Sequence, residues 1–319
     1  MRIKQEMKKK IYYAPLEGIT GYVYRNAHKK YFGNIDKYFL PFIVTNQTGK
    51  LKSKELHDIL PENNQGIVAV PQILSNNAEQ FIKLAEFIQE FGYEEINLNL
   101  GCPARTVVTK RRGAGLLAYP EELDRFLEKV YEGISIKLSI KTRIGLESPE
   151  EFEEILNIYN QYPVEELTIH PRVQQDFYKN APHMEVFKSA LDHSKNPVCY
   201  NGDIFTKEDF EKFTKEFPEV DAVMLGRGLL RNPGLGDEIR EGKQLTKDVV
   251  KAFHDELCCG YQEIMSGDRN VLFKMKEVWF YLGQSFDGAD KYLKEIRKTN
   301  KFSEYQSTVE SLFVKCELK

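Results

Sequence analysis

Apolar runs recur along the first three quarters of the chain, and most of them are followed by a stretch with helical spacing. Several runs place apolar or β-branched residues at consecutive positions, which is typical of strands that are buried on both faces. The candidate strands are residues 11–16, 38–44, 66–74, 94–100, 134–143, 165–171, 197–202 and 221–227.

The stretches between these strands carry readable helix ends. Asn76 or Asn77 can cap a helix that Gly92 ends, and Ser148 with Glu151 has the spacing of a capping box. Alternating strands and helices imply parallel strands. Eight of them over about 230 residues match a closed (β/α)8 TIM barrel, although an open doubly wound sheet is the alternative.

The pattern changes after Lys243. The stretches 247–265 and 271–283 have the spacing of amphipathic helices, and no strand alternation returns. The sequence therefore predicts two domains, a barrel over residues 1–242 and a small helical domain over 243–319.

The composition is that of a globular protein, with 41% hydrophobic residues and a net charge of -3. Because no global basic field is present, a polyanionic partner must be held by local patches. No apolar run approaches the roughly 20 residues of a membrane span, and the basic N-terminus lacks the apolar region of a signal peptide. We expect a cytoplasmic protein without a membrane partner.

The five cysteines show no paired spacing, which favours a reducing compartment. Cys258 and Cys259 could form half of a metal site with His254, but no further ligand set completes it. We therefore expect no metal.

Polar residues follow nearly every predicted strand. In a TIM barrel the carboxyl ends of the strands carry function. Any one of these residues is weak evidence, since strand ends often meet water, but together they predict an active site. They include Glu17, Thr20, Asn46, Gln72, Asn99, Cys102, Lys141, Arg143, His170, Arg172, Asn201, Asp203, Gly226 and Arg227.

The loops after the last two strands are rich in glycine, at 200–206 and 225–234. This is the usual phosphate position in TIM barrels, because glycine lets backbone N–H groups approach an anion. Tight turn geometry is the alternative explanation. The loops match neither a Walker loop nor the dinucleotide fingerprint, which favours a mononucleotide cofactor.

Lys141 has three possible roles at the end of its predicted strand. A lysine there can form a Schiff base, or it can place a fixed positive charge beside a flavin. It can also be a solvated charge at a strand end. The two glycine-rich loops favour the flavin.

The chain resembles the tRNA-dihydrouridine synthases, which use a flavin to reduce uridine in tRNA to 5,6-dihydrouridine. The resemblance covers nearly the whole chain, and the Asn-x-Gly-Cys-Pro segment is its most diagnostic part. It rests on residues 14–25, 97–107, 113–117, 140–145, 169–172, 200–204, 226–235 and 274–283, the last similar to the family's tRNA-binding helical domain.

The resemblance implies a role for each matching position. Cys102 resembles the catalytic acid, and Asn99 resembles the residue that holds the target uracil. The family usually has methionine in place of Leu16. FMN would be held by Pro15, Leu16, Glu17, Gln72, Lys141, His170, Asn201, Gly202, Asp203, Gly226 and Arg227.

The implied reaction adds a hydride from FMN to C6 of uracil and a proton from Cys102 to C5. An unperturbed thiol has a pKa of about 8.5, so it is mostly protonated at neutral pH and able to donate. NADPH is the reductant expected in this family. The target base must be everted from the folded RNA to reach a barrel mouth.

Cationic residues beside the cysteine predict the RNA contacts. Lys110, Arg111 and Arg112 could hold tRNA phosphates, and Arg143 and Arg172 are further expected to bind substrate. Two departures from the family pattern, at 171–173 and Lys276, concern these RNA contacts rather than the chemistry. The run 291–301 is also cationic, as either an exposed helix face or a further contact. We expect a monomer.

Two rival functions remain at this point. An FMN-dependent oxidoreductase acting on a free pyrimidine or another small molecule would need the barrel but not the helical domain. A catalytically silent RNA-binding protein would not need the full set of polar residues at the strand ends.

Overall fold

The computed structural model describes residues 9–319, so the basic segment 1–8 lies outside the described residues. The chain forms two compact units. The barrel unit comprises the chain up to Pro15, Asp36–Gly202 and Glu216–Met224, and the helical unit comprises Leu16–Ile35, Asp203–Lys215 and Leu225–Lys319. The predicted domain boundary between residues 242 and 243 stays a prediction.

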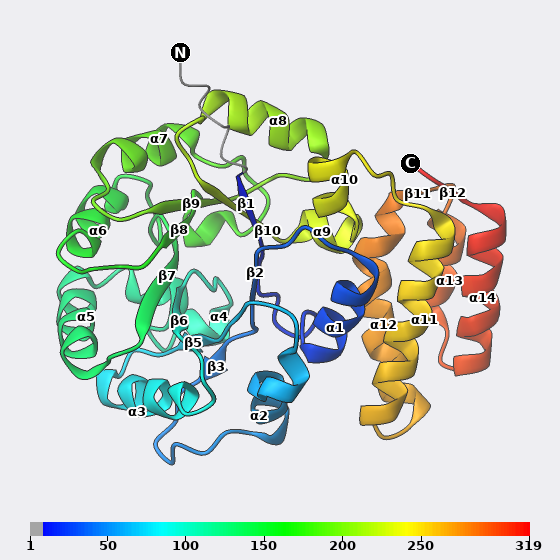
Figure 1. Ribbon diagram of the computed structural model, residues 1–319, viewed down its shortest axis with the longest axis horizontal. Helices are drawn as coiled ribbons and strands as arrows, with labels where there is room; N and C mark the ends of the chain where they lie inside the picture. Colours follow the sequence, from blue (N-terminus) through cyan, green and yellow to red (C-terminus); the bar gives the residue numbers. More distant parts are fainter. Residues whose placement is uncertain (1–8) are drawn as a thin grey trace. The chain divides into compact units, whose positions relative to one another are not determined.

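The barrel unit is built on a parallel sheet with helices α3, α5, α6 and α7 around it (Figure 1). Its strands are β1 (Lys10–Tyr13), β2 (Lys37–Phe39), β3 (Ile43–Val44), β4 (Ala69–Val70), β5 (Gln72–Leu74), β6 (Glu95–Leu100), β7 (Lys137–Arg143), β8 (Leu167–His170), β9 (Val198–Asn201) and β10 (Ala222–Leu225). Its helices are α2 (Ser53–Ile59), η1 (Pro61–Asn64), α3 (Ala78–Gln89), α4 (Arg105–Val108), η2 (Gly113–Leu116), α5 (Pro120–Gly133), α6 (Glu151–Tyr159), η3 (Gln174–Asp176) and α7 (Met184–His193).

The ten strand segments occupy eight positions in a closed barrel. In sheet order they run β3-β5-β6-β7-β8-β9-β10-β1-β2-β4. Pro71 alone separates β4 from β5, and Pro41 lies between β2 and β3. Each of these pairs is one interrupted strand, because proline has no N–H for the hydrogen-bond ladder. The predicted (β/α)8 TIM barrel is confirmed.

The interruption also shifts the register of the two strands. Phe39 pairs with Val70 before it, and Ile43 pairs with Ile73 after it. Three residues separate the pairing positions on one strand, whereas two separate them on the other. This extra residue is a β-bulge, a feature that re-aims side chains near active sites.

Local signals in the sequence account for the surrounding helices. The Asn77 side chain accepts a hydrogen bond from the backbone N–H of Gln80 at 2.9 Å and so caps α3. The buried face of α3 carries Ala78, Phe81, Leu84, Ala85 and Ile88, which recur at helical spacing.

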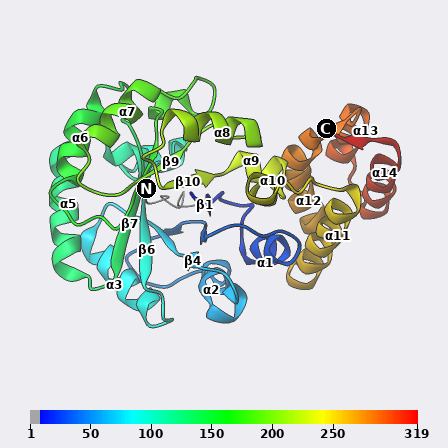
Figure 2. The same cartoon turned by 45° about the horizontal axis from the view of Figure 1, so that its top comes forward.

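The helical unit contains α11, α12, α13 and α14, which lie side by side (Figure 2). Its elements are α1 (Tyr22–Tyr31), α8 (Lys207–Glu216), α9 (Arg227–Arg231), α10 (Leu235–Glu241), α11 (Lys247–Ile264), α12 (Asp268–Leu282), η4 (Gly283–Ser285), β11 (Phe286–Asp287), α13 (Asp290–Lys298), α14 (Phe302–Lys315) and β12 (Glu317–Leu318). Within residues 9–319, no helix has the length and apolarity needed to cross a membrane.

A polar network is buried in the core of the helical unit. The Tyr305 hydroxyl accepts a hydrogen bond from Trp279 Nε1 at 2.9 Å and lies 2.6 Å from His254 Nε2. The other ring nitrogen of His254 lies 2.9 Å from an Asp255 carboxylate oxygen. Burial lowers the pKa of His254, so this histidine is a neutral structural group.

A second polar network lies inside the barrel. The Tyr12 hydroxyl donates to Glu166 at 2.9 Å, and the Lys37 ammonium pairs with Glu95 at 2.6 Å. Within the described chain, the Oε1 atoms of both glutamates are buried without a hydrogen-bond partner. Burial raises the pKa of Glu166 to about 7, despite the nearby Lys37 ammonium.

Glu166 makes the stability of the protein depend on pH. The folded protein holds the Glu166 proton more tightly than the unfolded chain, so this contribution is complete below about pH 4.5 and is lost as pH rises through about 7. We expect Glu166→Gln to remove this loss. Relative to wild type, the variant should gain roughly 2–3 kcal/mol in free energy of unfolding between pH 5 and pH 8, measured by urea unfolding.

Glu165→Gln is the matched control. Glu165 is adjacent in sequence, and its exposed carboxylate pairs with Lys137 at 3.0 Å. A stability difference from wild type that depends on pH in the same way for both variants would contradict this role for Glu166.

Candidate active site

The barrel unit brings most of the expected site residues to the carboxyl edge of its sheet. Asn99 on β6 pairs in register with Lys141 on β7, and Arg143 pairs with His170 on β8. The registers place these side chains on neighbouring strands, where the loops that follow the strands meet. This is the edge at which TIM barrels carry their active sites.

Cys102 lies in a turn that the Asn99 side chain holds. Asn99 Oδ1 accepts hydrogen bonds from the backbone N–H groups of Gly101 at 3.1 Å and Cys102 at 2.9 Å. The Cys102 carbonyl accepts from the Ala114 N–H at 3.2 Å. Gly113 has a φ of +55°, and a Cβ on it would lie 2.9 Å from the Cys102 carbonyl oxygen. Glycine is therefore required at position 113.

Cys102 is half-buried, which sets it apart from the structural cysteines. Cys199, Cys258 and Cys316 are buried, and Cys259 is exposed on a helix. Cys102 thus combines a partly accessible thiol with a backbone that is fixed on both sides by hydrogen bonds. Partial exposure distinguishes reactive cysteines from buried structural ones.

Lys141 is a half-buried cation near the cysteine. Within the described part of the chain, its ammonium group makes no hydrogen bond or ion pair with protein. Burial and the neighbouring Arg143 guanidinium lower its pKa to about 8. A cation held in this way fits an electron-rich or anionic group of a bound ligand.

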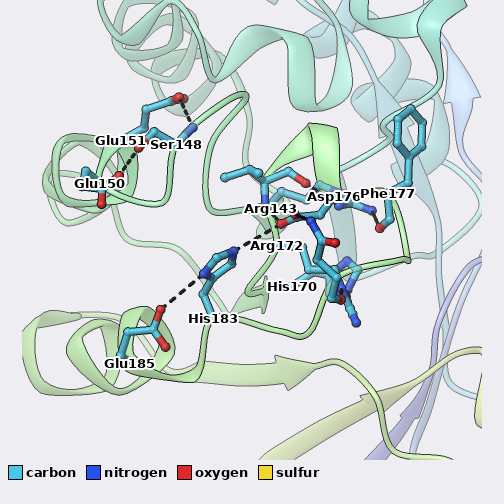
Figure 3. A network of polar contacts seen from close by, with 12 residues as sticks. Arg143, Ser148, Glu150, Glu151, His170, Arg172, Asp176, Phe177, His183 and Glu185 are labelled. Carbon is cyan, nitrogen blue, oxygen red and sulfur yellow. Dashed lines mark hydrogen bonds and ion pairs between the residues drawn. The ribbon is translucent and has the colours of Figure 1, made fainter.

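Arg143 joins two loops from inside the protein (Figure 3). Its guanidinium donates to the backbone carbonyls of Gly101 at 3.0 Å, Val173 at 2.8 Å and Phe177 at 2.7 Å. Arg143 is 1% exposed, so these three carbonyls take the place of water around its charge. It therefore fixes the turn after β6 against the loop after β8.

Arg172 orients His170 in the same region (Figure 3). Its Nε donates to the Asn180 carbonyl at 2.7 Å, and its Nη1 lies 3.0 Å from His170 Nε2. Since a guanidinium can only donate, His170 Nε2 is the acceptor and this imidazole is neutral. Arg172 is buried. The substrate-binding roles expected for Arg143 and Arg172 stay predictions.

Asp176 organises the remainder of the loop after β8. Its carboxylate accepts from the Val173 N–H at 3.0 Å and the Asn180 side-chain amide, and it pairs with His183 at 3.3 Å. Phe177 has a positive φ of 48°, an uncommon conformation for a bulky residue. Hydrogen bonds on both sides of Phe177 hold this conformation in place.

The cationic residues 110–112 lie in an anchored loop. The Asn76 side chain donates to the Lys110 carbonyl at 3.0 Å and accepts from Arg112 Nε at 3.1 Å. Arg111 pairs with Glu122 at 2.6 Å and lies over the Tyr119 ring. Lys110 and Arg111 are exposed, and Arg112 is half-buried. The loop thus presents positive charge on a defined backbone.

The remaining expected residues in the barrel unit are on β5 and β9 or beside strand ends. Gln72 is fully buried on β5, and Asn201 at the end of β9 donates to the Met224 carbonyl at 2.7 Å. A Cβ on Gly202 would lie 2.0 Å from the Tyr200 hydroxyl, so a side chain at this position would displace the buried Tyr200 ring. Pro15 directly follows Ala14, two residues beyond β1.

The helical unit contains the other expected residues. Leu16 opens a turn in which the Leu16 N–H bonds to the Thr20 hydroxyl at 2.9 Å, and Glu17 is the next residue. Arg227, which follows Gly226, pairs with Asp203 at 2.6 Å. Arg227 and Arg231 both lie over the Phe205 ring, at 5.2 and 4.1 Å from its centre.

The chain is similar in sequence to proteins of one known family. The profile of the family described as Dihydrouridine synthase (Dus) matches residues 12–317. The tRNA-dihydrouridine synthase B of Pasteurella multocida (strain Pm70) is 32% identical over 241 residues, which cover 74% of this chain and 70% of the relative. The chain belongs to the dihydrouridine synthase family. It is therefore an enzyme, an oxidoreductase.

A second relative covers more of the chain. The tRNA-dihydrouridine(16) synthase of Vibrio parahaemolyticus is 29% identical over 302 residues, 90% of this chain and 91% of the relative. Among solved structures, a morphinone reductase variant in complex with tetrahydroNAD has a TM-score of 0.54 at 11% identity and covers 76% of this chain and 90% of its own. A variant of NCR from Zymomonas mobilis has a TM-score of 0.53 at 15% identity, with the same coverage. These structures share the barrel fold.

Two residues at these sites were missed by the sequence analysis. The Tyr178 ring is 52% exposed, and it lies 6.0 Å from the His170 ring and 5.5 Å from the Arg143 guanidinium. Arg231 is a second cation beside Phe205 in the helical unit. For Tyr178, the only signal in the sequence is a pair of adjacent aromatic residues, Phe177 and Tyr178, in a polar loop.

The His, Cys, Asp and Glu side chains of this dihydrouridine synthase can be compared with the expected absence of a metal only within residues 9–319. Among residues 9–319, no group of three or more His, Cys, Asp or Glu side chains is arranged to hold a metal ion. His254, which the sequence places near Cys258 and Cys259, contacts Asp255 and Tyr305 instead.

The lowered pKa of Lys141 predicts unusual reactivity for this lysine. In the flavin-free protein we expect competitive acetylation of Lys141, followed by mass spectrometry, to show a deprotonation midpoint near pH 8. Lys137, on the same strand, is the internal control, because its hydrogen bond to Glu165 raises its pKa. A Lys141 midpoint as high as that of Lys137 would contradict the prediction.

Proposed function

We propose that this protein reduces uridine in tRNA to 5,6-dihydrouridine, with bound FMN and with NADPH as the reductant. The observation that carries the proposal is the Cys102 turn, which holds a half-buried thiol at the carboxyl edge of the barrel. Asn99 pairs in register with Lys141 on the neighbouring strand, and the Lys141 ammonium makes no hydrogen bond or ion pair within residues 9–319. Family membership supplies the reaction class.

The residues of the barrel unit fit a flavin. Gln72, Lys141 and His170 would hold it, together with Pro15 and the backbone at Asn201 and Gly202. The Lys141 ammonium has no protein partner in the described chain, which fits an electron-rich ring edge. Reduced FMN, when bound, supplies the hydride that C6 of uracil accepts. The roles expected for Leu16, Glu17, Asp203, Gly226 and Arg227, in the helical unit, stay predictions.

Cys102 completes the reduction as a general acid. As its S–H bond breaks, a C–H bond forms at C5 of uracil, and the thiolate that remains takes a proton from solvent. The hydride and the proton together saturate the C5=C6 bond, so the step balances. Asn99 would hold the uracil through the amide hydrogen that is not bonded to Gln72.

The RNA contacts are proposed for the cationic loop and the C-terminal helices. Lys110, Arg111 and Arg112 would hold tRNA phosphates beside the Cys102 turn, while the target base is everted from the RNA. Residues 243–319 would form the tRNA-binding domain. We further propose a cytoplasmic monomer.

The direct test is an anaerobic incubation of the purified protein with FMN, NADPH and an unmodified tRNA transcript. Mass spectrometry of the digested RNA should find a uridine that has gained one hydride and one proton. Reduction of free uridine monophosphate without reduction of the transcript would instead favour a small-molecule oxidoreductase and would overturn the proposal.

Cys102→Ala should separate the two half-reactions. We expect reduction of the flavin by NADPH at the wild-type rate, because that step needs no acid at uracil C5. Reoxidation of the reduced flavin by tRNA should slow by roughly 10²–10⁴-fold, the usual contribution of a positioned general acid. Rapid mixing on one flavin-saturated sample measures both rates.

Cys259→Ala is the matched control, since Cys259 is exposed on α11. It should leave both half-reactions unchanged. If Cys102→Ala reoxidises with tRNA at the wild-type rate, Cys102 does not act in the mechanism.

Charge reversal at Arg111 and Arg112 should weaken tRNA binding and flatten its dependence on salt. Each lost phosphate contact removes about one unit from the slope of log affinity against log salt. Lys129→Glu with Lys188→Glu, on the exposed faces of α5 and α7, makes the same change in net charge and is the control. Equal salt slopes for the two double variants would show that the loop makes no specific phosphate contact.

A further inference from the structure

A chain of buried side-chain amides runs from inside the barrel to the Cys102 turn. Ser139 Oγ accepts from Asn97 Nδ2 at 2.9 Å, and Asn97 Oδ1 accepts from Gln72 Nε2 at 2.7 Å. Gln72 Oε1 then accepts from Asn99 Nδ2 at 2.7 Å. Asn99 Oδ1 ends the chain at two backbone N–H groups of the turn.

The donor-to-acceptor order of these hydrogen bonds is fixed at both ends of the series. The Ile96 carbonyl can only accept, so the Ser139 hydroxyl donates to it at 3.3 Å and must accept from Asn97. At the other end, the backbone N–H of Cys102 can only donate, so Asn99 must present its oxygen. Both ends require the same orientation of every amide between them.

Because the amides are buried, only one orientation gives every donor an acceptor. Gln72, Asn97 and Ser139 are 0% exposed, and Asn99 is 7% exposed. Water therefore cannot replace a lost partner within the chain. If Asn97 were removed, Gln72 Nε2 would lose its buried acceptor, and the Gln72 amide would be held only by the bond from Asn99. The Asn99 side chain that supports the turn would then be less firmly positioned.

We propose that Asn97 and Ser139 are positioning residues for the Cys102 thiol, acting through Gln72 and Asn99. This inference rests on the proposed role of Cys102. Neither residue lies in the turn itself, and their strands bring them to it only through the pairings of Gln72 with Asn97 and of Asn97 with Ser139. The barrel interior thus sets where the acid of the reaction lies.

Asn97→Leu tests the chain, because leucine has a similar size and can form none of the hydrogen bonds. We expect tRNA-dependent reoxidation of the flavin to slow by roughly 10²-fold, as for a displacement of about 1 Å at a reacting group. The rate of flavin reduction by NADPH should fall much less, measured on flavin-saturated samples because Gln72 is also proposed to hold the flavin. Asn97→Asp should restore the rate, since a carboxyl group still offers an oxygen to Gln72.

A second readout does not depend on tRNA chemistry. The rate at which iodoacetamide alkylates Cys102, relative to the exposed Cys259 of the same molecule, reports the position of the thiol. We expect this ratio to change in Asn97→Leu and to return in Asn97→Asp. Asn64→Leu is the control, because it removes a buried amide that donates to two backbone carbonyls and does not belong to the series of amides that ends at the Cys102 turn.

The outcomes separate this inference from the proposed function. If the wild-type protein does not reduce tRNA, the proposed function fails, while the alkylation ratio still tests the amide chain. If wild type is active and Asn97→Leu keeps both its reoxidation rate and its alkylation ratio, the inference is overturned. Should Asn97→Leu not fold, Ser139→Ala removes the acceptor of Asn97 together with the donor to the Ile96 carbonyl, and an unchanged ratio in that variant overturns the inference equally.

Discussion

The buried guanidinium of Arg143 is the interaction on which the catalytic edge of the barrel depends. A charge in this position must be surrounded by hydrogen-bond acceptors, and the protein supplies them from two different loops. Removing the guanidinium would take a donor from three carbonyls, of which Val173 would keep only the Asp176 N–H, and would remove the link between the loops after β6 and β8. The same charge adds to the effect of burial in lowering the pKa of Lys141, so Arg143 contributes to both the shape and the electrostatics of this edge.

The interior of this barrel differs from a purely apolar core. Amides, a hydroxyl and two glutamates fill positions where close-packed aliphatic side chains would be expected. Buried polar groups cost free energy unless each one finds a partner, but a satisfied chain admits only one arrangement. The barrel therefore combines a less favourable core with a well-defined geometry at the residues near Cys102.

Much of the fold could be predicted from the sequence, because strands buried on both faces and capped helices leave strong local patterns. The capping box at Ser148 is instructive. Glu151 does bond the backbone N–H groups before the helix, yet α6 begins at Glu151 itself. The interruptions at Pro41 and Pro71 were missed, because the sequence does not show whether the sheet needs the hydrogen bond that a proline cannot donate.

The site was harder to predict than the fold. Residue types at strand ends indicated which side chains gather at one edge, but nothing in the sequence distinguishes a buried arginine from an exposed one. Arg143 and Arg172 were expected to bind substrate, and the sequence did not reveal that protein encloses both side chains. The amide chain was invisible for the same reason, since it depends on the register of three strands.

The bulge beside Pro41 and Pro71 has a consequence for local opening of the barrel. Pro41 and Pro71 cannot donate ladder hydrogen bonds, although the Pro71 carbonyl accepts from the Asn97 N–H at 2.8 Å, so the two interrupted strands share fewer bonds at this point. Hydrogen exchange reports such differences, because each amide exchanges through the opening of lowest free energy that exposes it to solvent. We therefore expect amides beside the two prolines to exchange faster than those of β6 and β7, and Gln72 directly follows the second proline.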